Sequence, residues 1–282
     1  ADALASLAER RGALLRYQAE VRRIRVVRGR VDALELTDGE RIEVAGVICN
    51  ADQQALAAGA FGAEAARALG RIAWRERSLS AITWAGPARA RGFPLAHHNV
   101  FFGGDYRAEF KALFGERRVP LDPTVYVCAQ DRIDDGEPAD PAGERLFCLV
   151  NAPPIGDLRS FGTEEIRQCE LNMRNSIERC GLGLRRPCPP VVTTPTDFDR
   201  LFPGSGGALY GPASHGWRAS FRRPGARTAL PGLYLAGGSA HPGAGVPMAA
   251  ISGRLAAQAI MEDYVSTSRS RRAAIAGGIS MR

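Results

Sequence analysis

The segment that most constrains the fold is a short apolar strand that runs through a glycine-rich turn into a long helix of small residues. The strand is predicted at 233–236 (LYLA), the turn at 237–245 holds four glycines, and a helical pattern follows over 246–262. This layout aims a helix N-terminus, with about half a positive charge, at an anionic ligand, and glycines let the backbone approach a flat ligand closely. The pattern is not G-x-G-x-x-G, so on spacing alone an ordinary tight turn explains it equally well.

The N-terminal part is predicted to contain mainly strands. Its apolar and alternating runs predict a helix at 3–11 and strands at 21–27, 31–36 and 41–49. The end of the last strand, VIC at 47–49, is apolar on both faces, which is typical of a strand in the middle of a layered sheet. Asn50-Ala51-Asp52 then predicts a turn and a helix cap, and a weakly helical, Ala-rich stretch follows at 53–69.

The middle of the chain has a different character. Short strands between long loops rich in Pro and Gly are predicted at 78–84, 99–102, 124–129, 145–151 and 188–194. Amphipathic helices are predicted at 105–114 and 164–180, the second capped by Thr163. The C-terminal tail has no hydrophobic periodicity, and we expect 265–282 to be disordered.

The charge pattern argues against nucleic acid as a partner. The formal net charge is +7, but of the 37 basic residues only Lys111 is a lysine, and the arginines are scattered among acids rather than gathered in a stripe. A generally cationic surface explains this best, and a lipid-facing patch is the alternative. No run of 18 apolar residues occurs, so no membrane-spanning helix is predicted.

The cysteines predict no metal site. None of the six forms a Cys-x-x-Cys pair, and no histidine lies at ligand spacing from any of them. Cys49, Cys128 and Cys148 lie in apolar strand-like runs, so we expect them to be small buried hydrophobic residues in a protein of a reducing compartment.

The sequence around the glycine-rich turn resembles a known family. LPGLYLAGGSAHPGAGVPMAAISGRLAAQAI, at 230–260, is similar to the C-terminal flavin-binding motif of the phytoene desaturase-type carotenoid desaturases, which belong to the glutathione-reductase-like and amine-oxidase-like flavoproteins. GGALYGPASHGWRASFRRPG, at 206–225, resembles one branch most, the bacterial hydroxyneurosporene or methoxyneurosporene desaturases. The run from 7 to 52, ending in VICNAD, also matches the family's order of helix, strand, hairpin and turn. The resemblance covers about residues 1–264, with 74–190 matched in pattern only.

The resemblance implies FAD as the cofactor and assigns contacts to it. Val21 corresponds to a strand position whose backbone contacts the adenine end, and Asn50 and Asp52 correspond to positions near the diphosphate side. Gly237 and Gly238 stand where many members of the family have Gly-Asp. The missing carboxylate implies that backbone N–H groups make the contacts there.

The resemblance also places the start of the last helix beneath the pyrimidine end of the flavin ring. The residues concerned are Gly245, Val246, Pro247 and Met248, of which Val246 and Met248 can donate an N–H group while Pro247 cannot. A helix N-terminus in that place stabilises the negative charge of a reduced flavin and makes the flavin a better hydride acceptor.

The implied fold is α/β. A partial FAD-binding domain of the glutathione-reductase-like type, 1–73 with 194–264, would carry an inserted substrate domain with a mixed sheet, 74–193. The family's G-x-G-x-x-G fingerprint is absent from these residues, and the chain does not begin with Met. We therefore expect the C-terminal part of a longer protein, one that by itself holds FAD weakly and has little activity.

The implied function is desaturation of a C40 carotenoid of the hydroxy- or methoxyneurosporene type in carotenoid biosynthesis. Such a substrate dissolves only in bilayers, so the expected location is cytoplasmic and peripheral, on the inner face of the cell membrane. The electron acceptor is not assigned. Three alternatives stay open: a redox-neutral carotenoid isomerase, another flavin oxidoreductase such as an amine oxidase, and a lipid-binding module without activity.

No catalytic residue is assigned from the sequence. His215 lies in a loop rich in Gly and Pro near the motif and is a candidate proton acceptor. The pair His97-His98 is better explained as the opening of a strand than as a metal or acid–base pair. Trp217 and Phe221 are candidates for lining an apolar channel, with core packing as the alternative.

Overall fold

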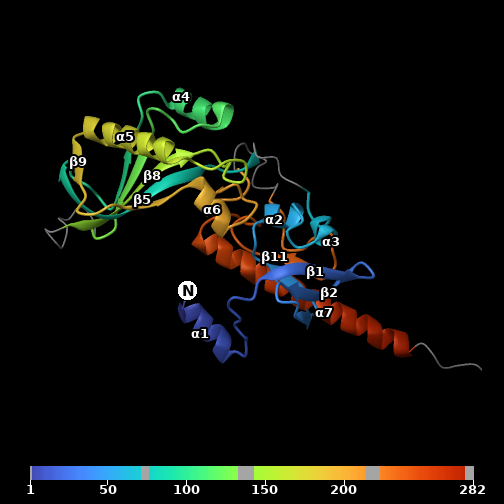
Figure 1. Ribbon diagram of the computed structural model, residues 1–282. Helices are drawn as coiled ribbons and strands as arrows, with labels where there is room; N and C mark the ends of the chain where they lie inside the picture. Colours follow the sequence, from blue (N-terminus) through green and yellow to red (C-terminus); the bar gives the residue numbers. More distant parts are fainter. Residues whose placement is uncertain (1, 71–75, 133–142, 214–222, 277–282) are drawn as a thin grey trace, which may run out of the picture.

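Two groups of strands, each with its own buried core, make up the chain (Figure 1). The computed structural model describes residues 2–70, 76–132, 143–213 and 223–276. The largest hydrophobic cluster draws its buried residues from 82–182, whereas the next one joins residues 24–68 to residues 233–240. The middle of the chain therefore has a hydrophobic core of its own. The domain boundaries at 73/74 and 193/194 stay a prediction.

The strands of the smaller group divide differently from the sequence prediction. β1 (Val21–Val27), β2 (Arg30–Leu36) and β3 (Arg41–Glu43) form an antiparallel sheet, and β4 (Val47–Cys49) leaves it to pair in parallel with β11 (Leu233–Leu235). The prediction of one continuous strand over 41–49 is therefore wrong. The break spans residues 44–46, and a Cβ atom on Gly46 would come within 2.9 Å of Ile260 Cδ1 of the last helix.

β4 is less enclosed than its composition suggests. Cys49 is buried, as predicted, but the side chain of Ile48 is 41% exposed. The expectation of burial on both faces is wrong for Ile48, because the sheet formed by the described residues contains only β4 and β11. The last helix, α7 (Val246–Ala276), packs against β11 through small residues, with Ala256 and Ala259 beside Tyr234.

The larger sheet has the order β10-β5-β8-β7-β6, and β9 pairs with the distal half of β5. Its ladders are all antiparallel, so the prediction of a mixed sheet is wrong. The bounds are β5 (Ser80–Gly92), β6 (His98–Phe101), β7 (Val125–Ala129), β8 (Glu144–Ala152), β9 (Leu182–Arg185) and β10 (Val191–Thr193).

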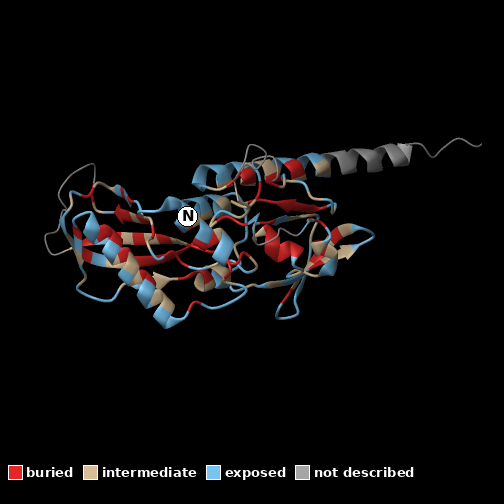
Figure 2. Cartoon of the chain, turned by 90° about the horizontal axis from the view of Figure 1, so that it is seen from above, coloured by how far each residue is buried: buried red, intermediate tan, exposed pale blue. Residues whose placement is uncertain are grey.

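One helix covers one face of this sheet. α5 (Thr163–Arg179) lies along it and buries Cys169, Met173 and Ile177 against it (Figure 1). In Figure 2 the buried residues follow the strands beneath this helix, and its outer side is exposed. The predicted cap at Thr163 is wrong: the N-cap is Gly162, and it makes no side-chain capping bond. Cys128 and Cys148 are buried in the sheet as predicted.

The remaining helices are short. The stretch 53–69 forms two helices separated by Gly59 and Gly62, both at positive φ, and the stretch 105–114 passes from an α-helix into a π-helical turn. Their bounds are α1 (Asp2–Arg10), α2 (Gln53–Ala57), α3 (Ala63–Ala66), α4 (Tyr106–Phe110), η2 (Lys111–Glu116) and α6 (Pro195–Leu201).

α7 extends beyond its predicted end. It continues to Ala276, so the prediction of a disordered tail from residue 265 does not hold for 265–276. Alanine and arginine, frequent in this stretch, are strong helix formers, and adding residues to an existing helix is easier than starting one. Among the described helices, none combines the length and the apolar character needed to cross a membrane.

Candidate functional site

The carboxyl ends of β4 and β11 meet at one edge of their small sheet. Parallel strands place their carboxyl ends together, and ligands of α/β proteins bind at such edges. Here Asn50 and Asp52 follow β4, and Gly237 and Gly238 follow β11. The structure thus brings together four residues that the sequence analysis assigned to one ligand.

Gly237 is required by the close approach of these two segments. Its φ is +108°, and a Cβ atom would lie 2.4 Å from Asn50 Oδ1. Its N–H group donates to Ser252 Oγ of α7 over 2.7 Å, and the Ser252 hydroxyl donates to the Ala249 carbonyl. The turn is therefore tied both to β4 and to the first part of α7.

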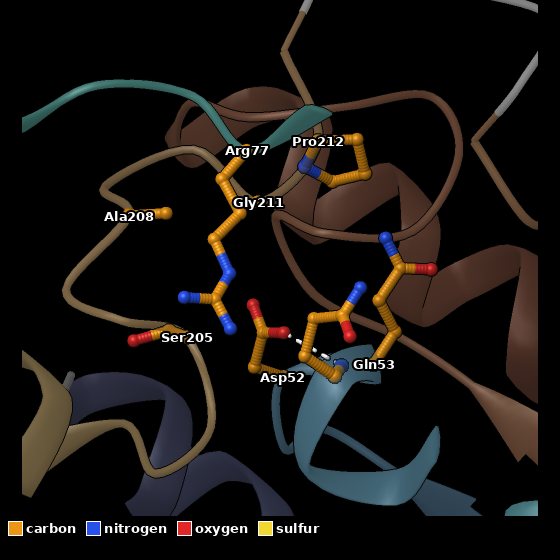
Figure 3. Close-up of a pocket in the computed structure, with 8 residues that line it drawn as sticks. Asp52, Gln53, Arg77, Ser205, Ala208, Gly211 and Pro212 are labelled. Atoms are coloured by element: carbon orange, nitrogen blue, oxygen red, sulfur yellow. Dashed lines mark hydrogen bonds between the residues drawn. The ribbon is translucent and has the colours of Figure 1, made fainter. Parts of the chain in front are cut away.

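A narrow crevice lies beside Asp52, between α2 and a glycine-rich segment at 204–212 (Figure 3). It is too tight to hold a water molecule. Figure 3 shows the Asp52 carboxylate facing the guanidinium group of Arg77, which reaches down from the chain that enters β5. The lining residues are Asp52, Gln53, Gln54, Arg77, Ser205, Ala208, Gly211 and Pro212.

Three buried N–H donors around this crevice have no hydrogen-bond partner within the described part of the chain. They are Nε2 of Gln53, Nε2 of Gln54 and Nε of Arg77. A buried donor without a partner costs about 1–3 kcal/mol, so such groups are normally paired. Three of them at one place indicate that oxygen acceptors of a ligand or of another polypeptide segment belong there.

Arg77 is otherwise firmly held. Its guanidinium group makes a two-pronged ion pair with Asp157, both N···O distances being 2.8 Å, and donates to the carbonyls of Pro154 and Gly204. These partners come from the segment after β8 and the segment after α6, so the cationic head is fixed between these two segments.

Asp52 combines a structural role with an unfavourable environment. Its side chain accepts a hydrogen bond from the Gln54 N–H over 2.8 Å and so caps α2, as predicted. Burial raises the pKa of Asp52 above its ordinary value, and the charges of Arg77 and Arg223 partly oppose this rise. The balance favours the neutral carboxyl more than in water.

Arg223 fixes the glycine turn from the other side. It donates to the carbonyls of Gly238, Tyr210 and Pro212 over 2.8–2.9 Å. Burial lowers the pKa of Arg223, while the charge of Asp52 opposes this shift. The arginine thus places a positive charge beside the turn and joins it to the segment that lines the crevice.

The start of α7 presents backbone donors. The Ala249 N–H bonds to the Gly245 carbonyl over 2.8 Å, so the N–H groups of Val246 and Met248 precede the first helical bond, and Pro247 has none. Met248 is 41% exposed and Val246 is more exposed still. Gly245 has a φ of +105°, which a side chain would strain.

The other predicted residues lie elsewhere. Val21 begins β1, pairs with Leu36 and is not among the residues that line the crevice. His215, Trp217 and Phe221 lie outside the described residues. The sequence analysis missed the buried donors of Gln53, Gln54 and Arg77; two consecutive glutamines directly after a helix cap were the only signal for them, and Arg77 had none.

Comparisons with known proteins support a flavoprotein. A family model described as flavin-containing amine oxidoreductase matches residues 1–261. The chain is 51% identical over 283 residues to the hydroxyneurosporene desaturase of Rubrivivax gelatinosus, covering 100% of this chain and 54% of that protein. It is 45% identical to the hydroxyneurosporene desaturase of Cereibacter sphaeroides, over 95% of this chain and 53% of that protein. These matches confirm the resemblance to carotenoid desaturases drawn from the sequence.

The chain spans about half the length of the curated relatives it matches. Among solved structures, an oxidoreductase from Methanosarcina mazei has a TM-score of 0.46 and 17% identity, covering 93% of this chain and 53% of that one.

Proposed function

The chain belongs to the flavin-containing amine oxidoreductase family, and from that membership we propose that it forms part of an FAD-dependent carotenoid desaturase. The observation that carries the proposal is the 51% identity, along the whole chain, to a protein named hydroxyneurosporene desaturase. The proposed substrate is accordingly a carotenoid of the hydroxyneurosporene type. The FAD would supply a hydride acceptor: one carbon loses a hydride and its neighbour a proton, and a C–C single bond becomes a double bond.

The carboxyl edge of β4 and β11 fits part of such a cofactor. The unpaired donors of Gln53, Gln54 and Arg77 suit phosphate or hydroxyl oxygens, and the charges of Arg77 and Arg223 suit a diphosphate. The crevice itself is too tight for a water molecule, so the proposed cofactor would lie against it and not inside it.

The start of α7 is the proposed partner of the flavin ring. Its N–H groups at Val246 and Met248 are ahead of the helical ladder, and the helix adds about half a positive charge at this end. Both features stabilise a flavin that gains negative charge on reduction.

The face of the larger sheet opposite α5 is suited to an apolar polyene. In this face Phe147 of β8 pairs with Ala85 of β5, and Leu149 pairs with Tyr126 of β7, which in turn pairs with Val100 of β6. These side chains remain partly or largely exposed. They support a role of the sheet in holding the substrate while water is kept away.

A second apolar surface supports attachment to a membrane. Phe102 and Leu121 are 68% and 70% exposed. The segment that contains Phe102 is held against the segment that contains Leu121, because the Gly104 N–H donates a hydrogen bond to the Asp122 carboxylate. The rings of Tyr106, Phe110 and Phe114 follow one another along α4 and η2, with centroids 4.7 and 5.8 Å apart.

We call Phe102, Tyr106 and Leu121 the α4 patch. Aromatic and apolar side chains beside cationic ones are typical of helices that lie in a bilayer surface, and the inner face of the cell membrane is the proposed location.

The test uses the chain extended to the length of its relatives and loaded with FAD. Met248→Pro removes one backbone donor, whereas Met248→Leu keeps the donor and most of the side-chain volume. A hydrogen bond to a charged group contributes about 1.5–3 kcal/mol, so the two-electron reduction potential should fall by about 30–65 mV in the Pro variant and stay unchanged in the Leu variant.

Product analysis completes the test. With hydroxyneurosporene and an added electron acceptor, the unaltered enzyme should form a product with one more double bond, and without an acceptor it should stop after one turnover. A product of unchanged hydrogen count would favour an isomerase. If both Met248 variants fold, bind FAD and keep the parent potential, the start of α7 is not the partner of the flavin.

A further inference from the structure

A cluster of potential metal ligands lies on the larger sheet, away from the site described above. Within the described residues, one atom each of His97, His98 and Cys128 can be chosen so that all three lie within 4.8 Å of one another. His98 of β6 and Cys128 of β7 are directly opposed in the antiparallel ladder, and His97 precedes β6. The sequence spacing between histidine and cysteine gave no sign of this, because a strand pairing creates the proximity.

His97 is held in the orientation of a metal ligand. Its Nδ1 lies 2.7 Å from the carbonyl of Arg132, which can only accept, so Nδ1 carries the proton and Nε2 of the neutral ring is left with a free lone pair. Arg132 is itself fixed by a buried, two-pronged ion pair with Glu144, both distances being 2.7 Å. Metal-binding histidines characteristically donate their second ring nitrogen to such a carbonyl.

His98 has a supporting partner on the neighbouring strand. Its Nδ1 lies 2.7 Å from the hydroxyl oxygen of Tyr126, and Tyr126 lies on the same face of β7 as Cys128, two residues before it. If Nδ1 donates to this hydroxyl, Nε2 of His98 is free to bind a metal ion. Tyr126 thereby prepares His98 as a ligand beside the cysteine.

We propose that His97, His98 and Cys128 form a binding site for Zn²⁺. Two imidazole nitrogens and one thiolate are a donor set that Zn²⁺ takes in proteins, with a fourth position left for water. Cys128 is buried, whereas His98 is exposed, so the cluster joins a buried thiol to a solvent-facing imidazole. None of its residues lies at the carboxyl edge of β4 and β11, but Cys128 pairs with Phe147 in the ladder of β7 and β8, so the ion would sit on the sheet face proposed above for the polyene.

The experiment is a titration of the purified, reduced chain with Zn²⁺ against a chromogenic chelator, followed by Co²⁺. The expected result is one Zn²⁺ per chain, and a Co²⁺ form with the ligand-field bands of four-coordination and an intense near-ultraviolet band from thiolate-to-cobalt charge transfer. The cysteine control is the double variant Cys180→Ser/Cys188→Ser, which removes the two exposed thiols outside the cluster and should change neither result.

Variants of the cluster locate the ion. Cys128→Ser should abolish the charge-transfer band and weaken Zn²⁺ binding by more than about 100-fold, and His98→Gln, at an exposed position, should weaken binding while leaving the fold intact. Tyr126→Phe removes only the supporting hydroxyl and should weaken binding by about 10- to 100-fold. This last effect separates a prepared site from an accidental grouping of side chains.

Two outcomes would overturn the proposal. One is the absence of stoichiometric Zn²⁺ binding by the unaltered chain. The other is binding that persists unchanged in His98→Gln and disappears in the Cys180→Ser/Cys188→Ser control, because the ion would then sit on the exposed thiols. Should Cys128→Ser fail to fold, His98→Gln and the Co²⁺ spectrum still decide the question.

Discussion

Asp52 shows how one side chain can serve the fold and oppose it at the same time. As the N-cap of α2 it satisfies the Gln54 N–H, and a cap of this kind stabilises a helix by about 1 kcal/mol. As a buried acid it has a raised pKa, so its charged form is disfavoured in the folded chain. The two effects can be separated because asparagine caps as well as aspartate but carries no charge.

At the residue scale we therefore predict opposite results for two substitutions of Asp52. Asp52→Ala should lower the free energy of unfolding at pH 7 by about 1 kcal/mol, through loss of the cap. Asp52→Asn should leave the free energy of unfolding equal to or above that of the parent. Denaturant titration of both variants is the measurement, and an Asn variant as unstable as the Ala variant would show that the charge of Asp52 stabilises the fold.

The difference in unfolding free energy between the parent and Asp52→Asn should change with pH in a defined direction. Because the pKa of Asp52 is raised on folding, the folded state binds more protons than the unfolded state between the two pKa values. In that window, which starts near the ordinary aspartate pKa of about 3.9, the stability contributed by Asp52 falls as pH rises. Other acids, such as Asp122 beside Arg179, have a lowered pKa and the opposite slope, so the difference between parent and Asp52→Asn isolates this residue.

At the scale of elements, the junction between β11 and α7 depends on where its glycines stand. Gly237→Ala should destabilise the chain by about 2 kcal/mol or more, because the added Cβ atom would meet Asn50 Oδ1 at 2.4 Å and the backbone has φ +108°. Gly253→Ala, inside α7 with open space around it, should stabilise by about 0.5–1 kcal/mol through helix propensity.

Thermal unfolding of the two glycine variants, side by side, is the measurement. The pair is matched in chemistry, since each adds one methyl group, and differs only in surroundings. A Gly237→Ala variant as stable as the parent would mean that the turn and β4 can separate without cost, which would also weaken the case for a ligand site at that edge.

At the scale of the whole molecule, the α4 patch is expected to bind the membrane. The double variant Phe102→Asp/Leu121→Asp should reduce flotation of the chain with anionic liposomes by at least about tenfold. Each substitution replaces an apolar side chain that would enter the bilayer surface with a charged one. Leu158→Asp is the control: it is 59% exposed in the segment between β8 and α5 and should float like the parent.

Flotation at low and high salt reads out this prediction. If high salt abolished flotation of the parent, the double variant and Leu158→Asp alike, attachment would be assigned to the scattered arginines instead of the α4 patch. Equal flotation of the double variant and the parent would place the membrane surface elsewhere on the molecule.

The sequence by itself determined the features that depend on neighbouring residues. Glycines between an apolar strand and a run of small residues specify the turn at 237–245 and the start of α7, and Asn-Ala-Asp specifies the cap at Asp52, because turns and caps are set by a few consecutive residues. Burial of Cys49, Cys128 and Cys148 followed from their apolar runs in the same way.

The tertiary structure alone decided what depends on residues far apart in the chain. β4 leaves its predicted strand because it pairs with β11, almost 190 residues later, and there Cys49 joins the buried cluster with Leu233 and Leu235. The donors around the crevice meet because Arg77 and segment 204–212 fold over α2, and His98 reaches Cys128 through a ladder whose register no local pattern encodes. Strand partners and registers are fixed by packing over the whole molecule, so these sites could not be predicted from local sequence.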